Sequence, residues 1–300
     1  MDALEASFAK WILSHRGLVI VLALLGVLAG SYGVTKLYFD SSYRVFFGKD
    51  NPQLLAFEAL ENTYTKNDNV MIVIAPEDGQ VFTRETLAGV EELTKAAWQV
   101  PYSNRVDSIT NFQYTAAIDD DLIVRDMVKD ALSLSDEAIE RVRQLVFAEP
   151  ALYRRLISDR GHVTAINVTT QIPVELLNEA SPEVVGFVRD MVAEFQQRHP
   201  DIDIYLTGMV VMNNTFFESA MNDMSSLIPI SFGLMLTILA VLVGGFFGTL
   251  VSLMVIAFSI TTAMGIGGHL GYPLTSPTSA APVIILTVAI ANCVHLLVTF

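Results

Sequence analysis

The hydrophobic positions of this sequence are concentrated in long runs, and the last quarter of the chain carries no charge. Asp223 is the final charged residue, and residues 224–300 contain no Asp, Glu, Lys or Arg. Three apolar runs follow one another there, separated by breaks that contain glycine or proline. Each run has roughly the 20 residues that a helix needs to cross about 30 Å of hydrocarbon. We therefore predict three transmembrane helices, at residues 226–245, 250–270 and 281–300.

A fourth apolar run, residues 18–34, lies near the amino terminus. The residues before it predict an amphipathic helix, because apolar side chains recur at helical spacing, at Leu4, Phe8, Trp11 and Ile12. We interpret residues 1–37 as an interfacial lead-in followed by the first transmembrane helix. A cleaved signal peptide, with its cleavage site near residues 27–29, is the alternative.

The charges are segregated from these runs. The chain is 52% hydrophobic and yet has a formal charge of −14, and residues 38–223 carry 15 Lys and Arg against 30 Asp and Glu. The pattern predicts an acidic, water-soluble domain between membrane segments, and it argues against nucleic acid as a partner. Lys10 and Arg16 precede the first helix and only Lys36 follows it closely, which favours a cytoplasmic amino terminus and an extracytoplasmic domain.

Within residues 38–223, short β-branched runs alternate with amphipathic segments in a recognisable order. In chain order they are a strand at 69–75, a helix at 83–100 that Thr83 caps, strands at 106–110 and 162–170, a helix at 181–199 that Ser181 and Pro182 open, and a strand at 202–206. This β-α-β-β-α-β order is that of the split ferredoxin-like unit. We therefore predict an α+β membrane protein, a transmembrane helix bundle (residues 224–300 with the first helix) with an extracytoplasmic ferredoxin-like domain.

Two further segments of this domain have local signals. Asn51 and Pro52 open a predicted helix at residues 53–62, whose apolar side chains we expect to be buried, namely Leu54, Leu55, Phe57, Ala59 and Leu60. Residues 116–160 are charged, and we interpret them as a mostly helical insertion in which Ser135 opens one helix. The acidic triplet at 119–121 lacks the ligand spacing of a calcium loop, so a solvated turn is the preferred interpretation.

No catalytic signature is present. The sequence has no phosphate-binding glycine loop, no His-Glu-x-x-His, no Gly-x-Ser-x-Gly and no paired cysteines, and its five histidines are scattered. Cys293 is the only cysteine, so the chain forms no internal disulfide. We expect neither an enzyme nor a metal or cofactor site.

Two groups of apolar or small residues are candidate functional positions. An adaptable face leads into the second membrane helix, and it either packs against the soluble domain or lines the path of a hydrophobic substrate: Met209, Met212, Phe216, Phe217 and Met221. A ridge of small residues in the third membrane helix recurs every four positions and predicts close helix packing: Ser259, Ala263, Gly267 and Gly271.

The layout of one amino-terminal helix, a large β-α-β-β-α-β domain and closely spaced helices resembles half of a resistance-nodulation-division (RND) exporter. The junction at residues 206–229 and the phrase IANCVHLL at residues 290–297 are similar to the hydrophobe-exporting, MMPL-like branch. The resemblance implies that residues 38–223 form the porter domain. It also implies two halves, so we expect this chain to be the first half, as a fragment or a naturally split piece, since its last apolar run is unbroken at Phe300.

One position departs from the resemblance. Relatives typically carry a proton-coupling aspartate where this chain has Asn292, and an intramembrane acid suits that task because charging it is costly. Asn292 cannot titrate. His295, three residues on and hence on the same helix face, either takes a proton role or is a neutral histidine bonded to a neighbour. Coupling then resides in the second half, or is lost.

The resemblance implies an inner (plasma) membrane exporter of hydrophobic or lipid-like molecules, driven by the proton gradient, that works with a second half and that forms a homo-oligomer or binds a periplasmic partner. A protein-translocation auxiliary of the SecDF kind shares the topology. A non-transporting sterol- or lipid-sensing scaffold is the other alternative, and Asn292 favours it, because a sensor needs no membrane acid.

Overall fold

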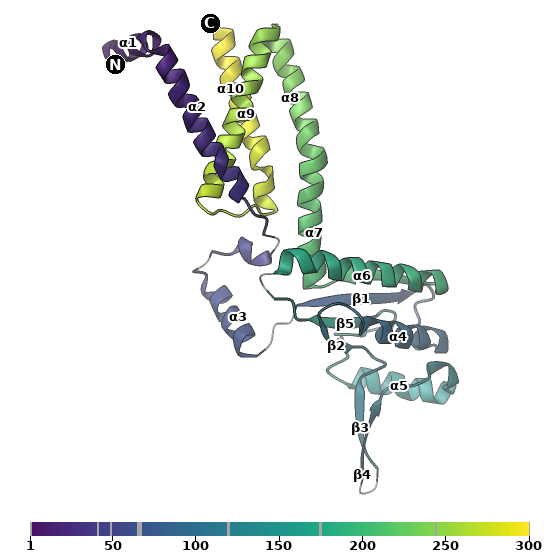
Figure 1. The fold of residues 1–300 in the computed structure, drawn as a ribbon. Coiled ribbons are helices and arrows are strands. Elements are labelled where there is room, and N and C mark those ends of the chain that lie inside the picture. Colours follow the sequence, from purple (N-terminus) through teal and green to yellow (C-terminus); the bar gives the residue numbers. More distant parts are fainter. Residues whose placement is uncertain are drawn as a thin grey trace. The chain divides into compact units, whose positions relative to one another are not determined.

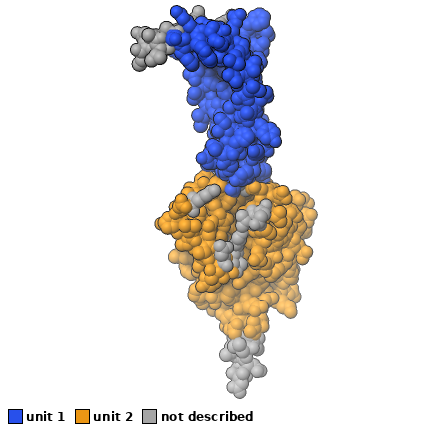
Figure 2. All heavy atoms as spheres, turned by 60° about the vertical axis from the view of Figure 1, so that its left-hand side comes forward, with its two compact units in different colours: residues 1–41, 216–300 blue, residues 42–215 orange. Residues whose placement is uncertain are grey.

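The computed structural model describes residues 2–40, 42–48, 50–64, 68–118, 121–173, 176–243 and 245–299. The chain forms two compact units (Figure 2), one of residues 1–41 with 216–300 and one of residues 42–215. Four helices in the described part are long and apolar enough to cross a membrane, which confirms the four predicted spans: Arg16–Lys36, Met209–Leu242, Phe246–His269 and Pro277–Leu296.

The second of these spans belongs to one continuous helix. α7 passes through a single π-helical turn, Asp223–Leu227, into α8, so that the last charged residue of the chain stands at the turn. Such π turns are rare and are often found at functional positions. The helices of this part of the chain (Figure 1) are α1 (Asp2–Ser14), α2 (Arg16–Tyr32), α7 (Met209–Asn222), α8 (Ile228–Val243), α9 (Phe246–His269) and α10 (Ala281–Thr299).

Three of the membrane helices meet at a small apolar centre. Leu239 of α8, Ile256 of α9 and Leu286 of α10 are fully buried there. Few other side chains of these apolar helices are buried, with only 6–17% of each span buried. A helix satisfies its own backbone hydrogen bonds, so such a surface is stable in lipid and would be unstable in water.

The other unit is built on a four-stranded antiparallel sheet. Its strands run in the spatial order β2-β5-β1-β6, with Val70 of β1 opposite Val168 of β5 and Ile72 of β1 opposite Leu206 of β6. This order confirms the predicted ferredoxin-like unit. The strands are β1 (Asn69–Pro76), β2 (Ser103–Asp107), β5 (Thr164–Thr170) and β6 (Ile202–Thr207), and the helices between them are α4 (Arg84–Ala97) and α6 (Leu177–Arg198).

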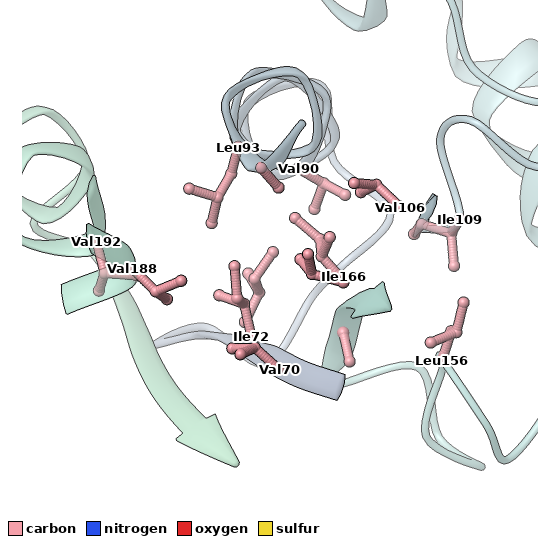
Figure 3. Packing of buried hydrophobic residues seen from close by; sticks show 14 of the residues in the cluster. Val70, Ile72, Val90, Leu93, Val106, Ile109, Leu156, Ile166, Val188 and Val192 are labelled. Atoms are coloured by element: carbon pink, nitrogen blue, oxygen red, sulfur yellow. The ribbon is translucent and has the colours of Figure 1, made fainter. Parts of the chain in front are cut away.

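The core of this unit lies between the sheet and the two helices. Alternate residues of β1 are buried because its apolar side chains point to one face. Figure 3 shows Ile72 directed toward Leu93 of α4 and toward Val188 and Val192 of α6. Full burial of one side chain of this size stabilises the folded state by about 1.5–3 kcal/mol. α4 begins as predicted, with the Thr83 side chain accepting the N–H of Thr86.

Two predicted boundaries are wrong. β2 begins at Ser103 and not at residue 106, because its first residues are polar and give no hydrophobic signal. α6 begins at Leu177, so Ser181 and Pro182 lie inside it and do not open it. A proline so near the helix start removes only one intrahelical hydrogen bond, which the buried face of α6 outweighs.

The helix after Asn51 forms, but its expected burial is wrong. Asn51 caps α3 (Pro52–Thr63) by accepting the N–H groups of Gln53 and Leu54. The apolar side chains of α3 are nevertheless exposed, by 51% at Leu55 and 55% at Leu60. An ion pair holds the helix instead, since Arg44 Nη2 lies 2.6 Å from a Glu61 oxygen and only 7% of the Glu61 side chain is exposed.

The predicted insertion at residues 116–160 is not mostly helical. It begins within an antiparallel hairpin of β3 (Gln113–Ile118) and β4 (Asp121–Asp126), and the only longer helix among its described residues is α5 (Asp136–Ala148), which Ser135 caps. β4 contains β-branched residues, but the charged residues around them conceal this strand signal in the sequence. Residues 119 and 120 of the acidic triplet lie outside the described residues.

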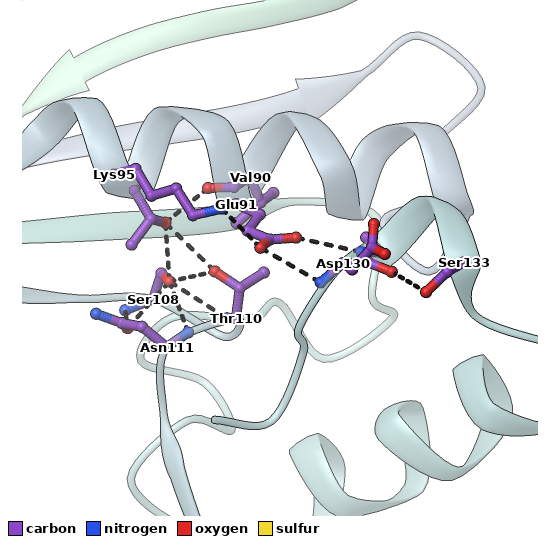
Figure 4. Close-up of polar contacts among 10 residues, drawn as sticks. Val90, Glu91, Lys95, Ser108, Thr110, Asn111, Asp130 and Ser133 are labelled. Carbon is purple, nitrogen blue, oxygen red and sulfur yellow. Dashed lines mark hydrogen bonds and ion pairs between the residues drawn. The ribbon is translucent and has the colours of Figure 1, made fainter. Parts of the chain in front are cut away.

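A carboxylate ties α4 to the segment between the hairpin and α5 (Figure 4). Glu91 accepts hydrogen bonds from Lys95 at 2.9 Å and from the backbone N–H groups of Asp130 at 3.4 Å and Ala131 at 3.2 Å. Burial, the largest influence, would raise the pKa of Glu91, but the hydrogen bonds from Lys95 and the two N–H groups together lower it. The ionised carboxylate therefore stabilises the folded state.

We expect Glu91→Gln to make the soluble unit less sensitive to acid. A carboxyl whose pKa is lowered by folding stabilises the fold above its unfolded pKa of about 4.3, and this stabilisation is lost as the pH falls through the folded pKa. The variant should be about 1 kcal/mol less stable at pH 7 and equal to wild type near pH 3. Thermal unfolding followed by Trp98 fluorescence measures this, with the exposed Glu194→Gln as control. A constant difference at both pH values would contradict the assignment.

Candidate functional site

A hollow of about 320 Å³ lies between α9 and α10 in the membrane unit. Along each helix the lining residues recur after three or four positions, with one adjacent pair, so each helix contributes one face. The polar lining consists of two hydroxyls, one amide and one thiol, and the remainder is aliphatic. The lining residues are Val251, Ser252, Val255, Ser259, Ala289, Asn292, Cys293 and Leu296.

Asn292 supplies the amide that faces this hollow from α10. The Ser259 hydroxyl opposite donates to the Val255 carbonyl at 2.8 Å, so its oxygen remains an acceptor for an amide N–H or a water. The lining contains neither a carboxylate nor an imidazole. Its polar groups can therefore hold a neutral polar partner or fix a helix contact, but the amide cannot take up a proton.

His295 does not join Asn292 at the hollow. Both residues are exposed on α10, yet the neighbours that line the hollow are Cys293 and Leu296. The spacing of three residues brings the two side chains to overlapping sides of the helix, but only one of them reaches the α9 face. The prediction that Asn292 and His295 lie on the same helix face is therefore only partly correct.

The closest helix contact is made by glycines that the predicted ridge does not include. A Cβ added to Gly265 of α9 would lie 2.0 Å from the Gly30 oxygen of α2, and one added to Gly268 would lie 2.0 Å from the Gly33 oxygen. The two backbones therefore touch, which only glycine permits. Ser31 Oγ also donates to Thr261 Oγ1 across this crossing at 3.0 Å.

The predicted ridge lies elsewhere on α9. Ser259 lines the hollow, and Ala263 is exposed. A Cβ added to Gly267 or Gly271 would meet nothing within 4 Å. In the sequence, the pattern that points to this crossing is a pair of glycines three residues apart in each helix. A search for small residues at every fourth position does not find it.

The crossing ends in a polar cluster. His269 places Nε2 3.0 Å from the Ala29 carbonyl and Nδ1 3.4 Å from the Lys36 ammonium. Because the carbonyl can only accept, Nε2 carries the hydrogen and Nδ1 accepts from Lys36. Beyond it, Leu274 exchanges backbone hydrogen bonds with the segment after α2, from its N–H to Tyr38 at 2.7 Å and from Asp40 to its carbonyl at 2.8 Å.

The methionine and phenylalanine residues lie along α7. Met212 and Met221 are among the exposed large apolar side chains, and Phe217 packs edge-on against Phe39 with ring centres 5.2 Å apart. Met209 and Phe216 are half-buried, and the Met209 N–H donates to the Asn69 side chain at 3.2 Å. Thus α7 packs at some positions and presents open apolar surface at others, and a substrate path along it remains a prediction.

Comparison with known families gives one match, to the MMPL family, over residues 46–296. The chain belongs to the MMPL family. Its members are membrane transporters of the RND superfamily and are not enzymes. The predicted resemblance to the MMPL-like branch is therefore confirmed, and so is the prediction of a multi-pass membrane protein. None of the curated proteins compared with the chain matches it.

The range that matches the MMPL family includes residues of both structural units. It includes β1 to β6 of the soluble unit and α7 to α10 up to residue 296, and so it also includes the hollow with Asn292. Both the sheet and the membrane helices of this MMPL chain are family features.

Proposed function

We propose that this MMPL chain exports hydrophobic or lipid-like molecules across the inner (plasma) membrane, with residues 38–223 as an extracytoplasmic porter domain that alternates between conformations. The observation that carries the proposal is the match of the soluble unit and the membrane helices together to one transporter family. The open methionine side chains of α7 support an apolar substrate, since methionine adapts to varied shapes.

The proton gradient is the proposed energy source, and Asn292 restricts where the proton can act. Residues 224–300 contain no Asp or Glu, so no carboxylate side chain lines the hollow at Asn292. In this proposal, His295 or a carboxyl outside residues 224–300 carries the proton. A second half of the transporter, a homo-oligomer or a periplasmic partner would complete the machine.

Export can be tested on the open face of α7. In the full-length protein, Met212→Ser with Met221→Ser should raise cellular retention of the hydrophobic dye Nile red several-fold, because polar side chains then interrupt the apolar path. Met254→Ser, which changes an even more exposed methionine of α9, should leave retention unchanged. If the double variant retains as much dye as wild type, α7 does not line the substrate path. If cells with and without the protein retain the same amount of dye, the protein does not export it.

Orientation is a separate test. In a Cys293→Ser background, a cysteine introduced at Glu77 should react with a membrane-impermeant maleimide in intact cells. One introduced at Phe247, in the first turn of α9, should react only after permeabilisation, because Lys10 and Arg16 favour a cytoplasmic amino terminus. Both positions are exposed, so access to the reagent decides the result. The reverse labelling would place the porter domain on the wrong side for an exporter.

A lipid- or sterol-sensing scaffold is the rival that Asn292 favours, because sensing needs no titrating group. A scaffold would show no protein-dependent change in dye retention, and the export assay therefore separates the two functions.

A further inference from the structure

A second, larger hollow lies in residues 42–215, and its lining residues belong to the hairpin β3–β4, to α5 and to the segment between them. Figure 1 shows where these elements lie in the chain. Its volume is about 910 Å³, within the range of about 300–1,000 Å³ that is common for small-molecule sites. Thirteen residues line it. They form two walls, a set of cations and an apolar floor.

Both walls of the hollow are held in place by regular structure. On α5, the residues that face it are spaced as one helix face, namely Ala138, Arg141, Val142 and Leu145. On the hairpin, Tyr114 is the cross-strand partner of Arg125, and Gln113 is that of Asp126.

The connection between the two walls is also anchored. The N–H of Met127 donates to Phe112 at 2.8 Å, and the N–H of Val128 donates to Thr110 at 3.0 Å. Glu91 of α4 accepts the N–H groups of the next residues, Asp130 and Ala131 (Figure 4). The hollow therefore has a shape that is set without a ligand.

Its charge is opposite to that of the domain around it. Three cations line the hollow, Arg125, Lys129 and Arg141, against the single carboxylate of Asp126. Residues 38–223 as a whole carry twice as many acids as bases. A concave cluster of cations in an acidic domain attracts anions locally, since the field is concentrated by the low-dielectric walls.

These cations are also unpaired among the described residues, whereas many others in the domain are not. Arg44, Arg84, Lys95, Arg105, Arg143 and Arg198 each form an ion pair with a carboxylate. None of the three cations of the hollow forms an ion pair with a described carboxylate, although Arg141 interacts electrostatically with Glu137, one turn earlier on α5. Their donors can therefore turn to an incoming anion, and arginine in particular binds carboxylate and phosphate in a bidentate manner.

The floor of the hollow is apolar. Met127 and Leu134 are half-buried, and Val142 is buried. A simple inorganic anion would leave this surface unused, whereas an acidic peptide needs an extended basic face and not an enclosed space. An amphiphile matches both parts, because its anionic head meets the guanidinium groups and its adjoining hydrocarbon covers the apolar floor.

We propose that this hollow binds the anionic head and the adjoining apolar part of an amphiphile that bears a phosphate or a carboxylate. The ligand class rests on the proposed function, export of lipid-like molecules, and narrows it to acidic ones. Arg125 and Arg141 hold the head from the two walls, Lys129 adds charge at the rim, and Val142 contacts the hydrocarbon.

The test is equilibrium binding to the full chain in nanodiscs of neutral lipid, followed by isothermal titration calorimetry. The probes are water-soluble dihexanoyl phosphatidic acid and decanoate, with dihexanoyl phosphatidylcholine and inorganic phosphate for comparison. At least one acidic amphiphile should bind tenfold or more tightly than the zwitterion and than phosphate. Arg125→Gln combined with Arg141→Gln should weaken that binding at least tenfold.

Arg143→Gln is the matched control, because it removes the same charge from α5 at a position that does not line the hollow. It should leave the affinity within twofold of wild type, and all variants are compared for thermal unfolding. The proposal is overturned if neither acidic amphiphile binds, if phosphate alone binds as tightly, or if the control weakens binding as much as the double variant. A chain that binds the probe but exports nothing overturns only the export proposal, and the reverse result overturns only this site.

Discussion

Replacing Gly265 with alanine is expected to force α2 and α9 apart and to unfold the membrane unit at a lower temperature. The added Cβ would stand 2.0 Å from the Gly30 carbonyl oxygen and 3.0 Å from the Ser31 Cα. Both are backbone atoms of a helix, so no side-chain rotation can relieve the clash. Overpacking of this kind typically costs about 1–3 kcal/mol, and the hydrogen bond from Ser31 to Thr261 would be strained as well.

Gly267 provides the control, because it lies two residues further along the same helix and an added Cβ meets nothing within 4 Å. Gly267→Ala should unfold at or slightly above the wild-type temperature, since alanine favours the helix. Thermal unfolding of the detergent-solubilised full chain measures both variants. Equal destabilisation by the two substitutions would show that the crossing at Gly265 is not a close contact, and a larger effect at Gly267 would restore the ridge predicted from the sequence.

Features set by local chemistry were predictable. The caps at Asn51 and Thr83 were correct because a side-chain oxygen needs only the N–H groups two or three residues ahead. The strand at β1 and the four membrane spans were correct because a short β-branched run and a long apolar run each report their own surroundings, a sheet or a bilayer.

Features that depend on a partner distant in sequence were not predictable. The exposure of Leu55 and Leu60 follows from how little of α3 the rest of the unit covers, which the composition of α3 does not contain. The role of Gly265 depends on the backbone of Gly30, more than 200 residues away. A search for small residues along one helix finds several ridges and cannot rank them.

The candidate sites show the same division. Asn292 was found through a family phrase, and Ser259 through a packing pattern, but only the structure places both at one hollow. The cationic hollow was missed, because Arg125 and Arg141 belong to a strand and a helix and share no motif. A count of charges along the chain shows only the acidic surplus that surrounds them.

Asn292→Asp is expected to give transport in the full-length protein a steeper dependence on pH if the hollow at α9 and α10 is still part of the coupling machinery. The native amide resembles a protonated acid and makes hydrogen bonds worth about 0.6–2 kcal/mol in a membrane, but it cannot change state. An acid at the same place costs about 2.5–3.5 kcal/mol more when charged, so its protonation would alter helix contacts. Transport measured from pH 5.5 to 8 with unchanged pH dependence would show that the site is no longer coupled.

Two alanine variants separate a structural from a proton-carrying role on α10. Asn292→Ala should weaken packing around the hollow and lower the unfolding temperature while leaving the pH profile of transport unchanged, because no titrating group is removed. His295→Ala should change that profile only if His295 carries the proton, since its ring does not line the hollow and its loss leaves Asn292 in place. If both variants transport like wild type at every pH, the proton acts at neither residue, and a carboxyl outside residues 224–300 becomes the remaining group in this proposal.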